Sequence, residues 1–199
     1  MQLTGQSLHF EAMVRDSVQT KARLLQAAID EFAAYGIAGA RVDRIAEAAA
    51  TNKQMIYSYF GNKDELFDQA FSADVERFRE AVDFDPLDLP GYAGRLFDRF
   101  EDDSSSLRLS TWYRLERPTG PGLQAVAEIN DVRLQRLRDA QKKGAVTTDF
   151  APAALLALIQ SIATSWSTMN PEFTSSKPLA RKERRRTVVE AVRRIVSPT

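Results

Sequence analysis

The stretch from Arg41 to Lys63, RVDRIAEAAATNKQMIYSYFGNK, constrains the fold of this chain more than any other segment. An apolar pattern with helical spacing starts at Val42, and a second one follows around Ile56. Between them lies Thr51-Asn52, two side chains of the kind that cap the start of a helix. The stretch therefore predicts two short helices joined by a tight turn.

The second short helix has an outward side suited to reading DNA. At about 100° per residue, and with Ile56 facing inward, Gln54 and Ser58 lie nearly opposite the core. Gln54 can pair with adenine through two hydrogen bonds, and Ser58 is compatible with several base edges. Cationic and phenolic neighbours suit phosphates, which also bind the free amides of a helix start. The residues predicted to contact DNA are Arg41, Thr51, Asn52, Lys53, Gln54, Tyr57, Ser58, Tyr59 and Lys63.

Helical periodicity continues through the rest of the chain without a convincing strand pattern, so the predicted fold class is all-α, with about nine helices. Residues 1–16 lack periodicity and are predicted to be a flexible arm. Residues 17–66 are predicted to form the helix-turn-helix domain, and residues 67–199 a larger helical domain. A loop rich in Pro and Asp at residues 83–91 ends a long fourth helix, which can connect the two domains.

Composition excludes several other classes of protein. The chain has no cysteine, which excludes disulfides, thiol catalysis and cysteine-ligated metals. His9 is its only histidine, so a catalytic triad and a histidine metal site lack their central residue. No apolar run reaches the roughly 20 residues of a membrane span, and no secretory signal is visible. We therefore expect a cytoplasmic protein with no metal, no cofactor and no membrane partner.

Charge says little about partners, because 27 basic and 27 acidic residues cancel. Net charge therefore gives no support for binding to nucleic acid. The local balance differs, since the stretch 41–63 holds four basic residues and two acidic ones, with no acid after Glu47. That bias has the sign expected for contact with phosphates.

The segment from about Ala22 to Phe67 resembles the DNA-binding domain of the TetR family of transcriptional repressors. The most specific part is NKQMIYSYFGNKDEL, residues 52–66, where a tyrosine, a phenylalanine and a lysine match the family in type and spacing. The residues that carry the resemblance are Ala28, Phe32, Gly36, Val42, Ile45, Ala46, Ala49, Lys53, Tyr57, Phe60, Lys63 and Leu66.

The resemblance implies an all-α homodimer whose last two helices form a four-helix bundle with those of the partner. It also implies a ligand cavity in the larger domain and a small-molecule effector that changes the spacing of the two reading heads. The function so implied is a ligand-responsive regulator released from a pseudo-palindromic duplex operator, with repression favoured and activation left open. The helices predicted at residues 152–166 and 179–196 have suitable apolar sides for the bundle.

Three positions depart from the family pattern. Ala50 stands where the turn usually has a glycine, and alanine in a left-handed conformation costs about 1 kcal/mol. Thr51 replaces an apolar residue, and Arg41 replaces the Thr or Ser that precedes the first short helix. We therefore expect a strained turn and a missing cap, with the Arg41 side chain available to a phosphate.

Aromatic and charged residues beyond the helix-turn-helix are candidates for a ligand pocket, with core packing as the competing interpretation. The basic run at residues 181–186 is interpreted as a solvated helix start with ion pairs at the dimer edge, rather than as a second nucleic-acid patch. The acidic excess at residues 74–103 is interpreted as a solvated face. The pocket candidates are Phe97, Phe100, Trp112, Tyr113, Glu116 and Trp166.

Two rival functions stay open at this point. One is a helical ligand-binding or scaffolding protein whose reading head no longer binds DNA, which the zero net charge and the missing turn glycine favour. The other is a helical enzyme, which the single histidine and the absence of cysteine disfavour.

Overall fold

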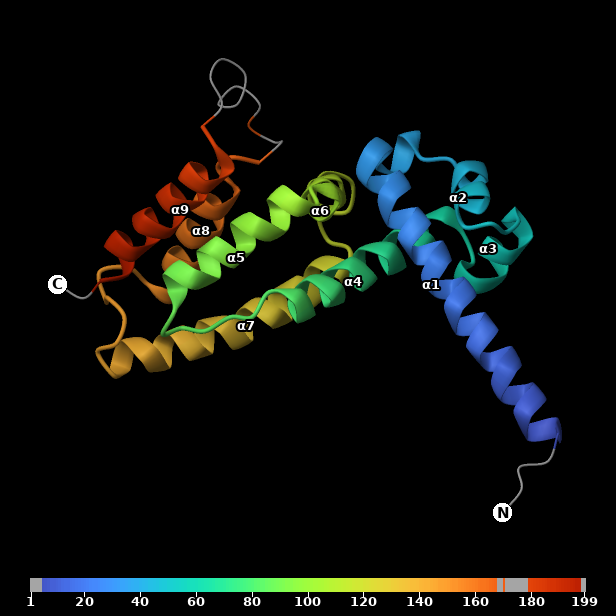
Figure 1. Cartoon of the computed structure of the whole chain (residues 1–199), viewed down its shortest axis with the longest axis horizontal. Coiled ribbons are helices and arrows are strands. Elements are labelled where there is room, and N and C mark those ends of the chain that lie inside the picture. The colour runs from blue at the N-terminus through green and yellow to red at the C-terminus, as the bar shows by residue number, and fades with distance from the viewer. Residues whose placement is uncertain (1–4, 168–169, 171–178, 198–199) are drawn as a thin grey trace. The chain divides into compact units, whose positions relative to one another are not determined.

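The computed structural model describes residues 5–167, 170 and 179–197, and for residues 5–14 only the backbone (Figure 1). Within these residues the chain forms nine helices and no strand, which confirms the predicted all-α class. The helices are α1 (Gly5–Gly39), α2 (Val42–Ala48), α3 (Lys53–Phe60), α4 (Lys63–Ala81), α5 (Leu89–Asp102), α6 (Ser105–Glu116), α7 (Pro121–Lys142), α8 (Pro152–Thr164) and α9 (Arg181–Val196).

The chain divides into two compact units, each made of two segments that are separated in the sequence. The first unit contains Met1–Asp74 together with Leu109–Gly122, and the second contains Val75–Arg108 together with Leu123–Thr199. The predicted boundary lay between residues 66 and 67 instead. The difference arises because the C-terminal half of α6 packs with the helix-turn-helix segment, as described below.

The first unit has a core built from the apolar sides of α1 to α4. Phe32 of α1 meets Phe67 of α4 edge to face, with ring centroids 4.8 Å apart. Ile45 of α2 and the inward residues Ile56 and Phe60 of α3 are buried in the same unit. The two short apolar patterns read from the sequence are therefore the sides of α2 and α3 that are buried in this unit.

Helix α1 differs from the sequence prediction at its start. It begins at Gly5, so residues 5–16, predicted as a flexible arm, have a helical backbone. Near its C-terminal end it breaks at Gly36, whose φ of 66° and ψ of −179° leave the helical region. This backbone conformation is essentially restricted to glycine, so the end of α1 depends on the absence of a side chain at Gly36.

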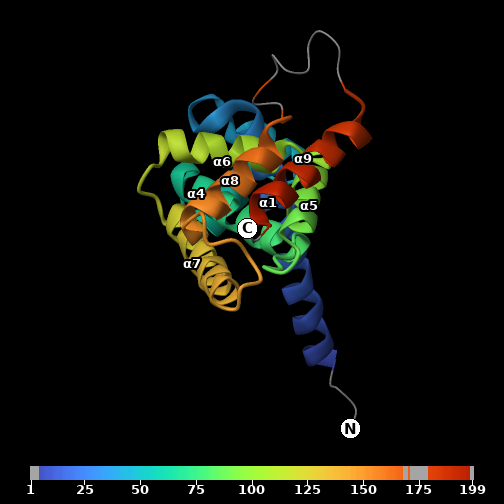
Figure 2. The same cartoon turned by 90° about the vertical axis from the view of Figure 1, so that its left-hand side faces the viewer.

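The second unit packs α5 against α8 and α9 over a continuous apolar core. Tyr92 and Phe97 of α5 are buried in one cluster with Ile159 of α8 and Val192 of α9. Figure 2 shows α5, α8 and α9 side by side, as does Figure 1. Gly94 lets α9 approach α5 closely, because a Cβ atom there would lie 3.1 Å from the Val189 side chain.

The basic run that starts α9 is paired within the chain. Three of its arginines bind three carboxylates of α5, so this end of the predicted solvated acidic face is paired within the chain. The pairs are Arg181 with Asp102, Arg184 with Glu101 and Arg185 with Asp98, at 2.7, 2.6 and 2.7 Å respectively. The run is therefore part of how the second unit holds together.

Two kinds of feature are absent from the described residues. None of the helices in those ranges is long and apolar enough to cross a lipid bilayer. In the same ranges, no group of three or more His, Asp or Glu side chains is placed to hold a metal ion.

Candidate DNA interface

The turn between α2 and α3 keeps its tight geometry without the expected glycine. Ala50 adopts a φ of 50°, in the left-handed region that costs alanine about 1 kcal/mol. The amide of Thr51 donates to the carbonyl of Ala46 over 2.9 Å, which closes the turn. Asn52 caps α3 by accepting from the amide of Met55, also over 2.9 Å. The sequence departure at this turn therefore adds strain to the turn and leaves its form intact.

The exposed side of α3 contains the side chains predicted to read DNA. Gln54 and Ser58 are exposed, with Lys53 and Tyr57 exposed beside them, while Ile56 is only 1% exposed. This is the arrangement expected from the helical wheel. Their contact with bases and phosphates stays a prediction, which their exposure makes sterically possible.

Two of the predicted phosphate contacts have partners inside the protein. The Lys53 ammonium lies 2.6 Å from the Asp43 carboxylate of α2, with both side chains about half exposed. The Tyr59 and Ser17 hydroxyls are 3.0 Å apart, which ties α3 to α1. A phosphate that binds Lys53 must therefore compete with Asp43 or share the ammonium with it.

The side-chain cap expected to be missing at Arg41 is indeed absent, and a carboxylate from α1 binds the Arg41 amide instead. Glu31, 8% exposed, accepts from the Arg41 amide over 2.8 Å and from the Arg44 guanidinium over the same distance. Arg44 also stacks on Tyr35, with its guanidinium carbon 4.3 Å from the ring centroid. The side chain of Arg41 makes no cap and stays exposed.

Sequence reasoning missed Glu31, although the signal was present. Leu24, Ala27, Ala28 and Glu31 fall at i, i+3, i+4 and i+7, so the acid lies on the buried stripe of α1. A carboxylate on such a stripe needs a charged or hydrogen-bonded partner. Here the partners are the Arg41 amide and the Arg44 guanidinium, at the start of α2.

Lys63 opens α4 beside a reciprocal cap. The Asn62 side-chain oxygen accepts from the Glu65 amide over 2.9 Å, and its side-chain nitrogen donates to the Glu65 carboxylate over 3.0 Å. These bonds fix the first turn of α4 and with it the backbone of Lys63. The predicted phosphate clamp thus sits on a well-defined helix start.

Half of the predicted pocket residues belong to the first unit. The Tyr113 hydroxyl donates to the Asp68 carboxylate over 2.7 Å and accepts from the Gly122 amide over 3.1 Å. Its ring stacks on Phe71 with centroids 4.0 Å apart. Burial, followed by the hydrogen bond to Asp68, raises the pKa of Tyr113 to about 12.

Trp112 and Glu116 close over the break in α1. Glu116 accepts from the Ile37 amide over 3.0 Å, which satisfies a donor that the break leaves without a helical partner. The Trp112 ring lies so close to Gly36 that a Cβ atom on that residue would be 2.9 Å from it. The C-terminal half of α6 is therefore structurally part of the first unit, which is called the reading head below.

The other three pocket candidates lie in the second unit. Phe97 is a fully buried core residue, while Phe100 and Trp166 are partly buried and pack against that core. Phe100 also stacks on Phe78 of α4, with centroids 5.3 Å apart. Phe97 is thus a core residue, in line with the competing interpretation of core packing. The six pocket candidates are divided between the two units.

We expect Tyr113→Phe to lower the free energy of unfolding by about 1 kcal/mol at pH 7, because it removes the hydrogen bond to Asp68. The unfolded chain releases this phenolic proton near pH 10, while the folded chain holds it to about pH 12. The wild type therefore loses stability as pH rises from 10 to 12, and the variant lacks that loss. Urea unfolding at pH 7, 9 and 11 should show a smaller difference in the free energy of unfolding between the wild type and Tyr113→Phe at pH 11. A difference that stays constant would contradict the raised pKa of Tyr113.

Two family models match most of this chain. One, described as bacterial regulatory proteins of the tetR family, matches residues 24–70. The other, described as the C-terminal domain of tetracyclin repressor-like proteins, matches residues 88–194. The chain belongs to the TetR family. The resemblance drawn from residues 22–67 is thereby confirmed, and the match extends over the second unit as well.

Relatives in the TetR family agree with this assignment. The transcriptional repressor SCO4008 of Streptomyces coelicolor is 38% identical over 161 residues, which are 80% of this chain and 83% of that protein. The crystal structure of the transcriptional regulator SCO4942, also from Streptomyces coelicolor, is 39% identical with a TM-score of 0.78, and covers 89% of this chain and 98% of that one. The chain is therefore a DNA-binding transcriptional regulator, and the prediction that it is not an enzyme is confirmed.

A more distant structure shares only the fold. The transcriptional regulator FadR of Bacillus subtilis, solved in complex with stearoyl-CoA, is 19% identical, with a TM-score of 0.64 over 86% of this chain and 97% of that one. At this identity the likeness concerns the arrangement of helices.

Proposed function

We propose that this TetR-family chain is a repressor that binds a pseudo-palindromic operator as a homodimer and is released by a small-molecule effector. The observation that carries the proposal is the polar side of α3, where Gln54 and Ser58 are exposed opposite the buried Ile56. Because its operator would be chromosomal, the proposal places the protein in the cytoplasm. Against a scaffolding protein with a disused head, the turn between α2 and α3 keeps its tight form although Ala50 replaces the usual glycine.

The proposed DNA contacts divide into base reading and phosphate binding. Gln54 and Ser58 face the base edges, since they occupy the centre of the exposed side of α3. Lys63 binds a phosphate from the first turn of α4, where charge and free amides act together. Arg41 adds a phosphate contact, because its side chain is exposed and makes no cap.

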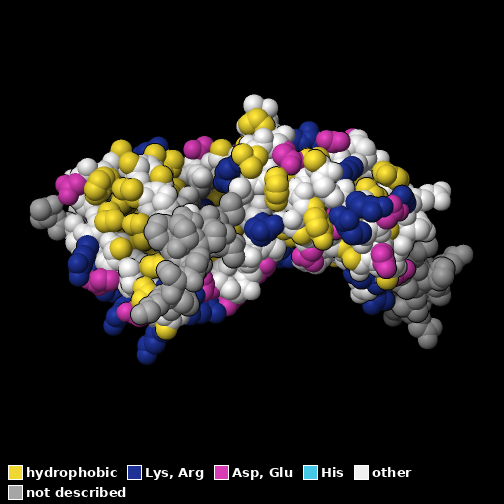
Figure 3. Space-filling view, turned by 90° about the horizontal axis from the view of Figure 1, so that it is seen from above, with side chains coloured by type: hydrophobic (Ala, Val, Ile, Leu, Met, Phe, Trp, Pro, Cys, Tyr) yellow, Lys and Arg dark blue, Asp and Glu magenta, His cyan; other side chains and the backbone are white. Residues whose placement is uncertain are grey.

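The proposed dimer uses α8 and α9. Figure 3 shows hydrophobic side chains gathered over the part of the surface where α8 and α9 lie. On α8 the exposed residues are small or apolar, which suits close packing of a second helix pair. They are Ala153, Ala154, Ala157, Leu158 and Ser161. A single self-complementary patch of this kind is sufficient for a two-fold dimer.

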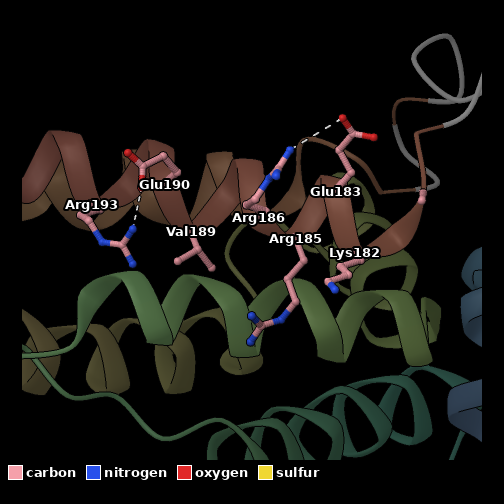
Figure 4. A pocket seen from close by; sticks show the side chains of 8 residues that line it. Lys182, Glu183, Arg185, Arg186, Val189, Glu190 and Arg193 are labelled. Atoms are coloured by element: carbon pink, nitrogen blue, oxygen red, sulfur yellow. Dashed lines mark hydrogen bonds and ion pairs between the residues drawn. The ribbon is translucent and has the colours of Figure 1, made fainter.

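Helix α9 contributes a hollow of about 640 Å³ to the same region (Figure 4). Its lining carries four basic and two acidic side chains around Val189. Figure 4 shows two ion pairs along it, Glu183 with Arg186 and Glu190 with Arg193. Helices of the partner would cover this hollow in the proposed dimer.

The proposed switch is a coupling free energy between effector site and reading head. An effector shifts the head only if it binds the non-reading state more tightly, with a typical coupling of about 1–3 kcal/mol. Both α4 and α6 contribute residues to each unit, since the division falls after Asp74 in one and after Arg108 in the other. The FadR complex with stearoyl-CoA supports the general idea that a protein of this fold can take a small-molecule ligand.

The experiment that tests the proposal selects genomic fragments bound by the purified full-length protein at moderate salt. We expect a pseudo-palindromic site with an affinity of about 10⁻⁸–10⁻¹¹ M, occupied by two copies of the chain. Binding without sequence preference, or no salt-dependent binding of duplex DNA, would contradict the proposal.

A pair of variants tests the division of contacts on the selected operator. Gln54→Ala should relax preference at one base position of each half-site, at a cost of about 1–3 kcal/mol. Lys63→Ala should weaken all sequences alike and lower the slope of log K against log salt by about one. Lys143→Ala, an exposed lysine at the end of α7, is the matched control and should change neither. Equal effects of the first two variants would refute separate roles.

A further inference from the structure

Met55 breaks the pattern expected of an apolar residue on α3. Its side chain is 39% exposed, whereas the next residue, Ile56, is 1% exposed. Both are apolar residues, adjacent in the sequence. The structure separates them, because α3 packs only Ile56 and Phe60 fully against the rest of the head.

The position of Met55 is well defined. Its amide donates to the Asn52 side chain over 2.9 Å, which fixes its backbone at the third position of α3. At about 100° per residue, Met55 lies on one side of the Gln54–Ser58 face and Tyr57 on the other. Met55 therefore borders the proposed base-reading face on the side that Tyr57 does not.

We propose that Met55 is a further base-reading residue, and that it contacts the C5-methyl group of a thymine in the major groove. This inference rests on the proposed function, in which α3 enters that groove. The thymine methyl is the apolar group that base edges display there. A methionine side chain is flexible and polarizable, so it can follow such a group without a rigid pocket.

Met55 is one of five large apolar side chains that are exposed among the described side chains of the first unit. The others are Val18 and Tyr35 on α1, Tyr57 on α3 and Leu115 on α6. Of these, only Tyr57 shares α3 with Met55, and it suits phosphates through its hydroxyl. Met55 is the fully apolar side chain that the recognition helix presents to solvent, which matches a methyl group better than a phosphate.

The test exploits a change of one methyl group in the DNA. Each thymine of the selected operator is replaced in turn by deoxyuridine, which lacks only the C5-methyl, and affinity is measured for the wild type and for Met55→Ala. At one thymine per half-site we expect deoxyuridine to weaken wild-type binding about fourfold. The same replacement should leave the affinity of Met55→Ala unchanged, because the partner of the methyl is already absent.

Two further variants keep the result interpretable. Met55→Leu retains an apolar side chain and should keep most of the sensitivity to deoxyuridine. Leu115→Ala removes an exposed apolar side chain of α6 in the same unit, and should show the wild-type profile at every thymine. Thermal unfolding of all variants checks that the head stays folded.

The outcomes separate this inference from the function beneath it. If the wild type binds a specific operator and Met55→Ala keeps the full deoxyuridine profile, the Met55 inference is wrong and the proposed function stands. If Met55→Ala alters the oligomeric state and leaves the profile intact, Met55 serves an interface between copies and the inference is again wrong. If the wild type selects no operator, the proposed function fails, and the inference fails with it.

Discussion

Replacing Gly36 by alanine should lower the free energy of unfolding of the reading head by about 3 kcal/mol. Two costs add at this position. The backbone, at φ 66° and ψ −179°, lies in a region that alanine adopts only with strain of about 1–3 kcal/mol. The new Cβ would also approach the Trp112 ring to 2.9 Å, and a rigid ring in a packed site moves only at a further cost of similar size.

Thermal or urea unfolding measures this effect, with a fall in the midpoint of about 6–12 °C for a chain of this size. Gly144→Ala is the matched control, because Gly144 also has a positive φ, 70°, but nothing within 4 Å of the new Cβ. The control should show only the backbone cost of about 1 kcal/mol. Equal losses in the two variants would show that the contact with α6 contributes nothing.

Replacing Glu31 by alanine should have the second largest effect, a loss of about 2 kcal/mol. Glu31 is the acceptor for the Arg41 amide at the start of α2, and removing it leaves that donor unsatisfied in a part-buried site. The alanine also leaves space between α1 and α2 that the carboxylate filled. We expect α2 to lose definition at its start, and operator affinity to fall together with stability.

Glu31→Gln should recover part of the loss, since its amide oxygen can still accept from Arg41. Glu47→Ala removes an exposed acid from α2 and should change stability by less than about 0.5 kcal/mol. Chemical unfolding and operator binding should be measured on the same samples. A loss after Glu47→Ala equal to that after Glu31→Ala would point to general charge effects in place of capping.

Local periodicity was sufficient to predict the faces of the reading head. Ile56 and Gln54 fall on opposite sides of α3 because helical geometry fixes their directions once one of them is buried. Ala50 was located as the weak position because the turn demands a positive φ whatever residue occupies it. These features depend on neighbours in the chain, so the sequence contains them directly.

The features that the sequence did not reveal depend on contacts across long separations. Glu116 meets the Ile37 amide across 79 residues, and no local pattern links the two. Trp112 was predicted to line a ligand pocket because it is aromatic and stands among charged residues. In the structure it lies against the break in α1 at Gly36. Met55 and Ile56 are adjacent apolar residues, and only the packing of α3 shows that the first is exposed and the second buried.

The ion pairs between α5 and α9 also bear on how DNA finds this protein. A chain with zero net charge exerts little long-range attraction as a whole, so the local arrangement of charge decides where a polyanion first makes contact. The arginines at 181, 184 and 185 are matched by carboxylates of α5. They therefore attract a duplex less than unpaired arginines would, which under the proposed function favours first contact through the first unit.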